Sequence, residues 1–267
     1  MRTEREDQET GRQGNLPPSF PVISLLTDFG TADYFVGAVK GAILSVNPQV
    51  VIVDITHEIP GQDIEAGAFM LLAAYKTFPA GTVHVAVVDP GVGSTRRPII
   101  VAANEQLFVG PDNGIFSYIY ERESSHRIFH VTEQKYFRTD PSSTFHGRDI
   151  FAPVAAALST GVAPEAFGPE VSDEVRLTSL ESPLRIIHID RFGNCVTNIR
   201  RKTFEETSLS INGMTISALR KFYDEADPSG EVFAIWGSAG FLEISVNGGS
   251  AAQILGAKRG DEVSFTG

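Results

Sequence analysis

Residues 22–27 (VISLLT) and 50–55 (VVIVDI) are short apolar runs, and the segment 34–46 between them carries apolar side chains at helical spacing. The alternation continues downstream, because a predicted helix over 63–78 is followed by a third apolar run over 82–88. Continuous apolar strands separated by helices are typical of parallel sheets that are covered on both faces. This stretch therefore predicts an α/β domain with a mainly parallel sheet.

The next part of the chain extends the same domain. Two more strands are predicted over 98–103 and 106–109. Asn113 is a candidate cap for a helix that runs through Tyr120, and an alanine-rich helix is predicted over 149–158.

From about Pro183 the pattern changes to short strands between turn signals such as Phe192-Gly193-Asn194 and Asn247-Gly248-Gly249. Short strands with little helix favour a small antiparallel barrel or sandwich. We expect a disordered leader over 1–20, the α/β domain over 21–170, a linker over 171–182 and a small antiparallel β-barrel domain over 183–267.

Composition excludes several classes of protein. The 267 residues include 22 Lys and Arg against 33 Asp and Glu, for a net charge of −11, which disfavours nucleic acid and anionic membranes as partners. No apolar run approaches the ~20 residues of a membrane span, and the polar N-terminal stretch has no signal-peptide core, so a cytoplasmic protein is predicted. Cys195 is the single cysteine, which excludes an intrachain disulfide framework and a cysteine-based zinc site.

Polar groups follow three of the predicted elements where ligands collect in open α/β sheets. Thr27-Asp28-Phe29-Gly30 ends the first strand, Asp89-Pro90-Gly91-Val92-Gly93 ends the third, and Phe145-His146-Gly147-Arg148-Asp149 opens a helix. Each has a simpler interpretation, as a helix cap, a proline turn and a surface loop. Their shared position at one sheet edge favours a functional site.

A second cluster, Asp190-Arg191-Phe192-Gly193-Asn194, lies between two strands of the second domain. It is either a hairpin turn or an aromatic face beside an amide that can hold a purine ring. The sequence contains no nucleotide-binding glycine motif, nucleophile elbow or zinc-protease motif. Its six histidines are scattered, and His84 and His188 fall inside apolar strands.

Together these segments resemble the S-adenosylmethionine hydroxide adenosyltransferase family, whose relatives include the fluorinase and the chlorinase. The resemblance runs from about Val22 to Val263, and its motifs occur in the same order as in the family. They are Thr27-Asp28-Phe29-Gly30, Asp89-Pro90-Gly91-Val92-Gly93 with Arg96, Pro111-Asp112-Asn113-Gly114, Thr144 to Asp149, Asp190 to Asn194 with Thr197-Asn198, and Gly237 to Ile244 with Asn247-Gly248.

The resemblance implies a hydrolase that converts S-adenosyl-L-methionine and water to adenosine and L-methionine by substitution at the ribose C5′. It implies a homotrimer with sites at subunit interfaces, and no metal or other cofactor. Asp89, Arg96 and His146 would serve the attacking water. In that comparison Asp28 would take the ribose hydroxyls.

The remaining substrate contacts are also carried over from the resemblance. Adenine would meet Phe192, Asn194, Tyr223 and the backbone near Val246. The methionine ammonium and carboxylate would meet Asp33, Asp190, Ser238 and Glu243.

Three functions with different chemistry compete with this hydrolase. The first, a halide-using enzyme of the same superfamily, is disfavoured because the fluorinase and chlorinase carry a tyrosine where Asp89 stands, and the fluorinase has a serine where Gly147 stands. An arginine of the fluorinase is replaced by Ala239, so the methionine carboxylate must be held differently. The second is a non-catalytic S-adenosylmethionine or adenosine sensor, and the third is a metal-dependent hydrolase that uses Asp28, Asp89 and His146.

Overall fold

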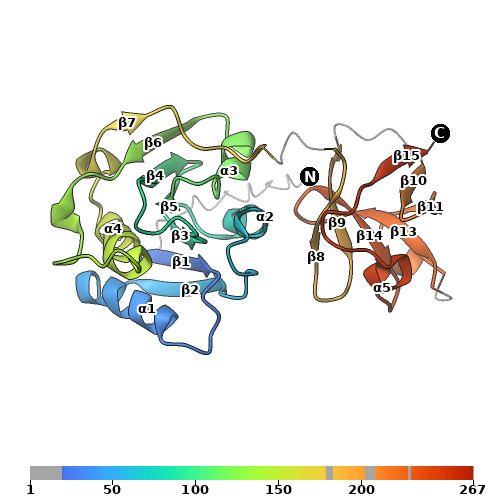
Figure 1. The fold of residues 1–267 in the computed structure, drawn as a ribbon, viewed down its shortest axis with the longest axis horizontal. Coiled ribbons are helices and arrows are strands. Elements are labelled where there is room, and N and C mark those ends of the chain that lie inside the picture. Colours follow the sequence, from blue (N-terminus) through green and yellow to red (C-terminus); the bar gives the residue numbers. More distant parts are fainter. Residues whose placement is uncertain (1–19, 179–182, 202–207, 228–229, 267) are drawn as a thin grey trace, which may run out of the picture.

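The structure is a computed structural model that describes residues 20–178, 183–201, 208–227 and 230–266. The leader predicted over 1–20 lies outside the described residues except for Phe20. Figure 1 shows a larger domain with helices around a central sheet, beside a smaller domain made mostly of strands. No helix in the described ranges is long and apolar enough to cross a membrane.

A seven-stranded sheet forms the centre of the first domain, in the order β2-β1-β3-β5-β4-β6-β7. Its strands are β1 (Val22–Thr27), β2 (Val51–Thr56), β3 (Val83–Val87), β4 (Pro98–Ala103), β5 (Gln106–Pro111), β6 (His126–His130) and β7 (Glu170–Val171). Strands β2, β1, β3 and β5 are parallel, whereas β4, β6 and β7 pair antiparallel. The sheet is therefore mixed, and the prediction of a mainly parallel sheet holds for one half only. The reversal follows from Asn104-Glu105, since a two-residue connection joins only antiparallel strands.

Helices cover both faces of this sheet, as predicted. Helices α1 (Phe35–Val46) and α4 (Ala152–Ser159) pack on one face through a shared apolar core, and α2 (Ile64–Ala74) and α3 (Ser117–Arg122) pack on the other. Strand β1 serves both cores, because successive side chains of a strand point to opposite faces.

Two helix starts differ from the prediction. Asn113 does not cap α3, because its Oδ1 accepts the N–H of Ile115 at 3.2 Å and its Nδ2 donates to the carbonyl of Val88 at 2.8 Å. It therefore fixes the turn before the helix. The helix predicted from Asp149 begins as a π-helical turn, Gly147–Phe151, which leads into α4.

The second domain consists of two sheets around one apolar core. The five-stranded sheet has the order β12-β13-β14-β9-β8, and the three-stranded sheet has the order β11-β10-β15. The strands are β8 (Ile186–Ile189), β9 (Cys195–Arg200), β10 (Ser208–Ile211), β11 (Met214–Ile216), β12 (Leu219–Arg220), β13 (Val232–Trp236), β14 (Phe241–Val246) and β15 (Ser264–Thr266), with one short helix, α5 (Ala251–Leu255). In the described part of the chain no strand ladder joins the two sheets into a closed barrel.

The two domains meet at the face of the first domain that carries α2 and α3, which Figure 1 shows between the central sheet and the second domain. Phe69 of α2 packs against Phe241 of β14, with ring centroids 5.7 Å apart. Glu65, in the first turn of α2, pairs with Arg185 and Arg259 of the second domain. This contact fixes the second domain against the helices that also support the edge of the sheet.

The segment that precedes the second domain is tied to the first. Asp112, at the end of β5, accepts the backbone N–H of Val175 at 2.9 Å, and Ser117 Oγ accepts that of Leu177 at 2.9 Å. Residues 179–182 of the predicted linker lie outside the described ranges.

A buried polar network crosses the central sheet at His84. Ser24 Oγ lies 2.6 Å from His84 Nδ1, and His84 Nε2 lies 3.2 Å from Gln106 Oε1. The Gln106 amide nitrogen donates to backbone carbonyls, so its oxygen faces the ring and His84 Nε2 carries the proton. Burial lowers the pKa of His84 to about 4, so the imidazole is neutral at pH 7.

This network predicts an acid-sensitive stability. Because the folded pKa of His84 lies below the unfolded value of about 6.5, the unfolded chain binds more protons between these two values. The contribution is present above pH 6.5 and is lost as the pH falls towards 4, for a total of about 3 kcal/mol. Urea unfolding of His84→Gln across this range should give a shallower pH slope than the wild type. A variant with the same slope as the wild type would contradict the assignment.

Candidate active site

Three loops of the first domain enclose a cavity of about 420 Å³ at the carboxyl edge of the sheet. Asp28 follows β1, Asp89 follows β3, and His146 precedes the π-helical turn before α4. Phe29 and Phe145 form an apolar wall, with ring centroids 5.9 Å apart. A cavity with an aromatic wall and two carboxylates suits a ligand that is partly apolar and partly cationic.

Asp89, Arg96 and His146 form one hydrogen-bonded cluster at this cavity. Arg96 Nε donates to both carboxylate oxygens of Asp89, at 2.9 and 3.0 Å, and its Nη2 donates to Asp89 Oδ2 as well. The same Nη2 lies 2.9 Å from Nδ1 of His146. The Arg96 guanidinium also rests over the Phe151 ring, 5.1 Å from its centroid. The three side chains that were predicted from distant motifs thus lie together.

Arg96 determines which nitrogen of His146 carries the proton. A guanidinium only donates, so Nδ1 must accept, and the proton of a neutral ring is then on Nε2. Burial and the positive charge of Arg96 lower the pKa of His146, against the opposite effect of Asp89 and Asp149. The ring is therefore uncharged at neutral pH and presents an N–H donor.

The loop that carries His146 is anchored by Asp149, which is buried in the π-helical turn. Its carboxylate accepts two hydrogen bonds from Arg148, at 2.7 and 2.8 Å, and the backbone N–H of Ser142 at 2.9 Å. The Arg148 guanidinium lies 4.9 Å from the centroid of the Phe145 ring. These hydrogen bonds anchor the segment between Ser142 and Asp149, which carries His146.

Asp28 is held by a loop that sequence reasoning missed. Asp28 Oδ2 accepts the backbone N–H of Gln62 at 2.8 Å, and Gln62 adopts a φ of +66°, which is unusual for a residue with a side chain. Gln62 also lines the cavity. The sequence does contain a signal for this loop. Gln62 lies between Pro60-Gly61 and Asp63, the N-cap of α2, which predicts a turn immediately before that helix.

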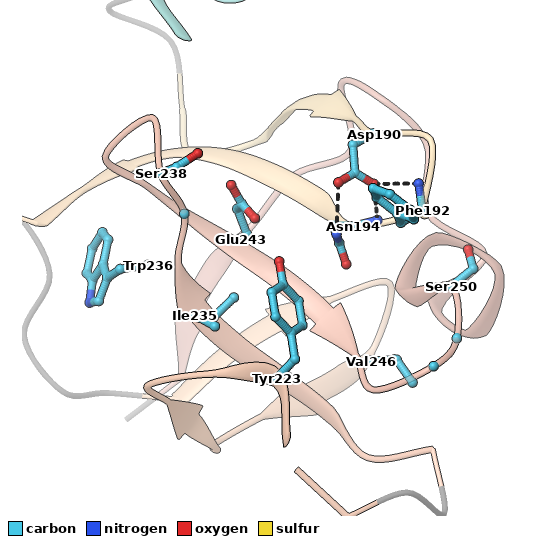
Figure 2. A pocket seen from close by; sticks show the side chains of 13 residues that line it. Asp190, Phe192, Asn194, Tyr223, Ile235, Trp236, Ser238, Glu243, Val246 and Ser250 are labelled. Carbon is cyan, nitrogen blue, oxygen red and sulfur yellow. Dashed lines mark hydrogen bonds between the residues drawn. The ribbon is translucent and has the colours of Figure 1, made fainter. Parts of the chain in front are cut away.

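A second cavity, of about 840 Å³, lies on the second domain and is drawn in Figure 2. It shares no lining residue with the first cavity. Two exposed aromatic rings border it, Phe192 with 76% and Tyr223 with 43% of their surface accessible. Exposed rings of this size offer flat faces on which a planar ligand can stack.

The two carboxylates of the second cavity have different surroundings. Asp190 accepts the backbone N–H groups of Phe192 and Asn194, both at 2.9 Å, and the Asn194 side-chain amide at 2.8 Å (Figure 2). It therefore shapes the loop. Glu243 is half-buried, and burial together with the charge of Asp190 raises its pKa. Its carboxylate lies against Gly237, where a Cβ would come within 1.7 Å of Oε1, so a larger residue at 237 would displace the Glu243 side chain.

The predicted site residues therefore fall into two groups and one outlier. Asp28, Asp89 and His146 line the first cavity, with Arg96 behind Asp89. The second cavity is lined by Asp190, Phe192, Asn194, Tyr223, Ser238, Glu243 and Val246. Asp33 is exposed and lines neither.

The first cavity does not resemble a metal centre. Among the described residues there is no group of three or more His, Cys, Asp or Glu side chains that could hold a metal ion. Both carboxylate oxygens of Asp89 and Nδ1 of His146 already bind the Arg96 guanidinium, so these atoms are not free to act as metal ligands. This geometry disfavours the metal-dependent hydrolase.

The fold and the site define a two-domain protein with an Asp–Arg–His cluster at the carboxyl edge of an α/β sheet and an aromatic cavity on a separate β domain. Residues 23–168 match the SAM hydroxide adenosyltransferase N-terminal domain, and residues 184–264 match the C-terminal domain of that family. The chain belongs to the SAM hydroxide adenosyltransferase family.

Similar proteins with an assigned function support membership of this family. The chain is 39% identical to the (R)-S-adenosyl-L-methionine hydrolase of Methanocaldococcus jannaschii, over 91% of this chain and 95% of that one. It is 37% identical to the enzyme of the same name from Thermus thermophilus, over 89% and 96%. A fluorinase of Nocardia brasiliensis is 26% identical, over 91% and 96%. The crystal structure of an uncharacterized conserved protein from Thermotoga maritima superposes with a TM-score of 0.85 at 34% identity, covering 92% of this chain and all of that one.

Proposed function

We propose that this protein hydrolyses (R)-S-adenosyl-L-methionine to adenosine and L-methionine. Relatives that match at 36–39% identity over about nine tenths of the chain carry that name. Since the amino acid is already specified as L, the prefix R describes the sulfonium centre. The observation that carries the proposal is the hydrogen-bonded cluster of Asp89, Arg96 and His146 at the wall of a cavity.

The chemistry requires a positioned water. Its oxygen forms a bond to C5′ while the C5′–S bond breaks and both electrons go to sulfur, which leaves as the neutral thioether of methionine. One proton is released from the water oxygen, and Asp89 accepts it before it passes to solvent. A carboxylate has about four lone-pair sites, so Asp89 can take this proton while it holds Arg96.

Asp89 need not be a strong base, because the attacking oxygen becomes strongly acidic only as its bond to carbon forms. The sulfonium already leaves readily, so orientation of the water is the main requirement, with a contribution of up to about 7 to 11 kcal/mol. In this proposal Arg96 fixes the carboxylate and His146 directs its Nε2–H at the water oxygen.

The remaining roles follow the two cavities. Asp28 takes the ribose hydroxyls with the oxygen that Gln62 does not occupy. Phe192 and Tyr223 stack on adenine, which Asn194 and the backbone at Val246 contact at its edge. Glu243 and Asp190 hold the methionine ammonium, and Ser238 donates to its carboxylate. A contact from Asp33 rests on the resemblance alone, because Asp33 lines neither cavity. The raised pKa of Glu243 supports a cationic partner, because an ammonium group relieves the unfavourable charge.

The proposal includes a homotrimer in which the first cavity of one subunit faces the second cavity of its neighbour. It is supported by the division of the predicted contacts between two cavities with no common residue. Exposed Phe192 would then be covered by the adjacent subunit. The domain limits, closure of the second domain into a barrel and a cytoplasmic location also stay predictions.

A halide-using enzyme is the second candidate, since fluorinases are among the relatives. Asp89 opposes it, because a carboxylate beside the nucleophile position would repel a halide. A sensor without catalysis would leave the cluster of Asp89, Arg96 and His146 without a task.

Product identity tests these functions together. Incubation with each sulfonium epimer in ¹⁸O-labelled water should place the label in the 5′-hydroxyl of adenosine, with the R epimer as the preferred substrate. A parallel reaction with chloride should yield no 5′-chloro-5′-deoxyadenosine. A chlorinated product would establish the halide enzyme, and binding of S-adenosylmethionine without turnover of either epimer would establish the sensor.

A further inference from the structure

His57 is a buried histidine that the proposed mechanism does not use, and it lies directly behind the loop that carries Asp28. Only 5% of its surface is accessible. Its Nδ1 lies 2.8 Å from the hydroxyl of Thr27, and its backbone carbonyl accepts the N–H of Gly30 at 2.8 Å. His57 therefore holds the loop 27–30 from both sides of Asp28.

The contacts of Thr27 and Asp54 orient the ring of His57. Thr27 Oγ1 accepts the N–H of Phe29 at 3.3 Å, so its own proton is available for Nδ1 of His57. With Nδ1 as the acceptor of this hydroxyl, Nε2 is the nitrogen that carries a proton towards the Asp54 carboxylate, which only accepts. Nε2 faces the carboxylate of Asp54, 3.1 Å from Oδ1, in an electrostatic contact without the direction of a good hydrogen bond.

The chain of contacts continues to the surface. Asp54, on the edge strand β2, also pairs with Lys40 of α1 at 2.6 Å. Lys40 and Asp54 are partly exposed, whereas His57 and Thr27 are buried. Each member thus limits the freedom of the next, and the last contact before the cavity is the hydroxyl of Thr27.

We propose that His57 is a positioning residue for Asp28 and acts through Thr27. With Thr27 and Gly30 fixed by His57, and Oδ2 of Asp28 held by Gln62, the other carboxylate oxygen remains directed at the ribose hydroxyls. A carboxylate that is fixed before the ligand arrives loses less freedom on binding. The inference rests on the proposed function, since it needs a ribose at Asp28.

The test compares two ligands that differ only at the hydroxyls that Asp28 would take. Adenosine and 2′,3′-dideoxyadenosine are titrated into the full-length protein by calorimetry. In the wild type the loss of hydrogen bonds to a charged acceptor should weaken binding by at least about tenfold. Equal wild-type affinities would overturn the ribose assignment, which belongs to the proposed function, whatever the variants do.

Two pairs of variants then isolate the positioning effect. Thr27→Val removes the hydroxyl at nearly constant volume, and His57→Leu removes the acceptor. In each variant the affinity for adenosine should fall until it is within about threefold of the affinity for 2′,3′-dideoxyadenosine. The affinity for 2′,3′-dideoxyadenosine should stay at the wild-type value. Thr27→Ser and His57→Asn keep the hydroxyl and an acceptor at the Nδ1 position, so they should retain the wild-type ratio.

A matched control breaks a different contact between the same two segments. Thr31→Val removes the exposed hydrogen bond from Thr31 to Glu58 (3.2 Å) and should leave both affinities unchanged. A purely structural role of His57 would weaken both nucleosides equally. That outcome, or a wild-type ratio in Thr27→Val, would overturn the proposal even if His57→Leu were unstable.

Discussion

Asp89→Ala and His146→Ala should each lose about 10²–10⁴ of kcat while their affinity for adenosine stays at the wild-type value. Without the carboxylate, the proton of the attacking water has no acceptor, and Arg96 loses its three hydrogen bonds to Asp89. Without the imidazole, Arg96 loses its second partner and the Nε2–H donor disappears. In the proposed mechanism both groups act on the water and not on the nucleoside, so the loss should fall on kcat.

The matched control uses the neighbouring arginine. Arg97 pairs with Asp173 at 2.7 Å, and the side chain of Asp173 is 77% exposed. Exposed ion pairs contribute little, so Asp173→Asn should keep the wild-type kcat. The measurement is steady-state release of adenosine with a parallel titration of adenosine binding. Wild-type kcat in Asp89→Ala or His146→Ala would remove that residue from water activation.

The first domain could be predicted from local patterns because its strands and helices carry their signals within ten to fifteen residues. The runs over 22–27, 50–55 and 82–88 became parallel strands, and α1 covers all but the first residue of its predicted range. The direction of each strand in the sheet could not be predicted in this way, because an apolar run reads the same for a parallel and an antiparallel strand. Only the two-residue turn at Asn104-Glu105 revealed that β4 is reversed, and its residues are not those of a common hairpin turn.

The candidate site also had a part that the sequence predicted and a part that it did not. The motif pattern selected Asp89 and His146, and the structure brings them to one cavity through Arg96, although His146 and Arg96 are 50 residues apart. The proton position on His146 depends on that tertiary contact, so no sequence pattern contains it. The internal hydrogen bonds of Asp190 were also hidden, because an aspartate that shapes a turn has the same sequence signature as one that binds a ligand.

The proposed trimer has the second large effect, because it predicts that two inactive variants restore each other. Asp89→Ala damages only the first cavity, whereas the double variant Phe192→Ala/Tyr223→Ala damages only the second. Removal of these exposed rings should leave folding intact and weaken substrate binding by about tenfold or more for each stacked ring. Each variant alone should therefore be nearly inactive at substrate concentrations well below KM.

Co-expression with two different tags isolates mixed oligomers of these variants. If each site combines the first domain of one subunit with the second domain of its neighbour, every trimer that contains both variants has one site in three with two intact halves, and about one third of the activity should return. Mixed oligomers of Asp89→Ala and His146→Ala serve as the control, because both changes lie in the first cavity and no arrangement rebuilds it. Recovery only in the first mixture requires a site shared between chains. Mixed oligomers that form but stay inactive in both cases would place the complete site within one chain, and the exposed rings of the second domain would then need another ligand.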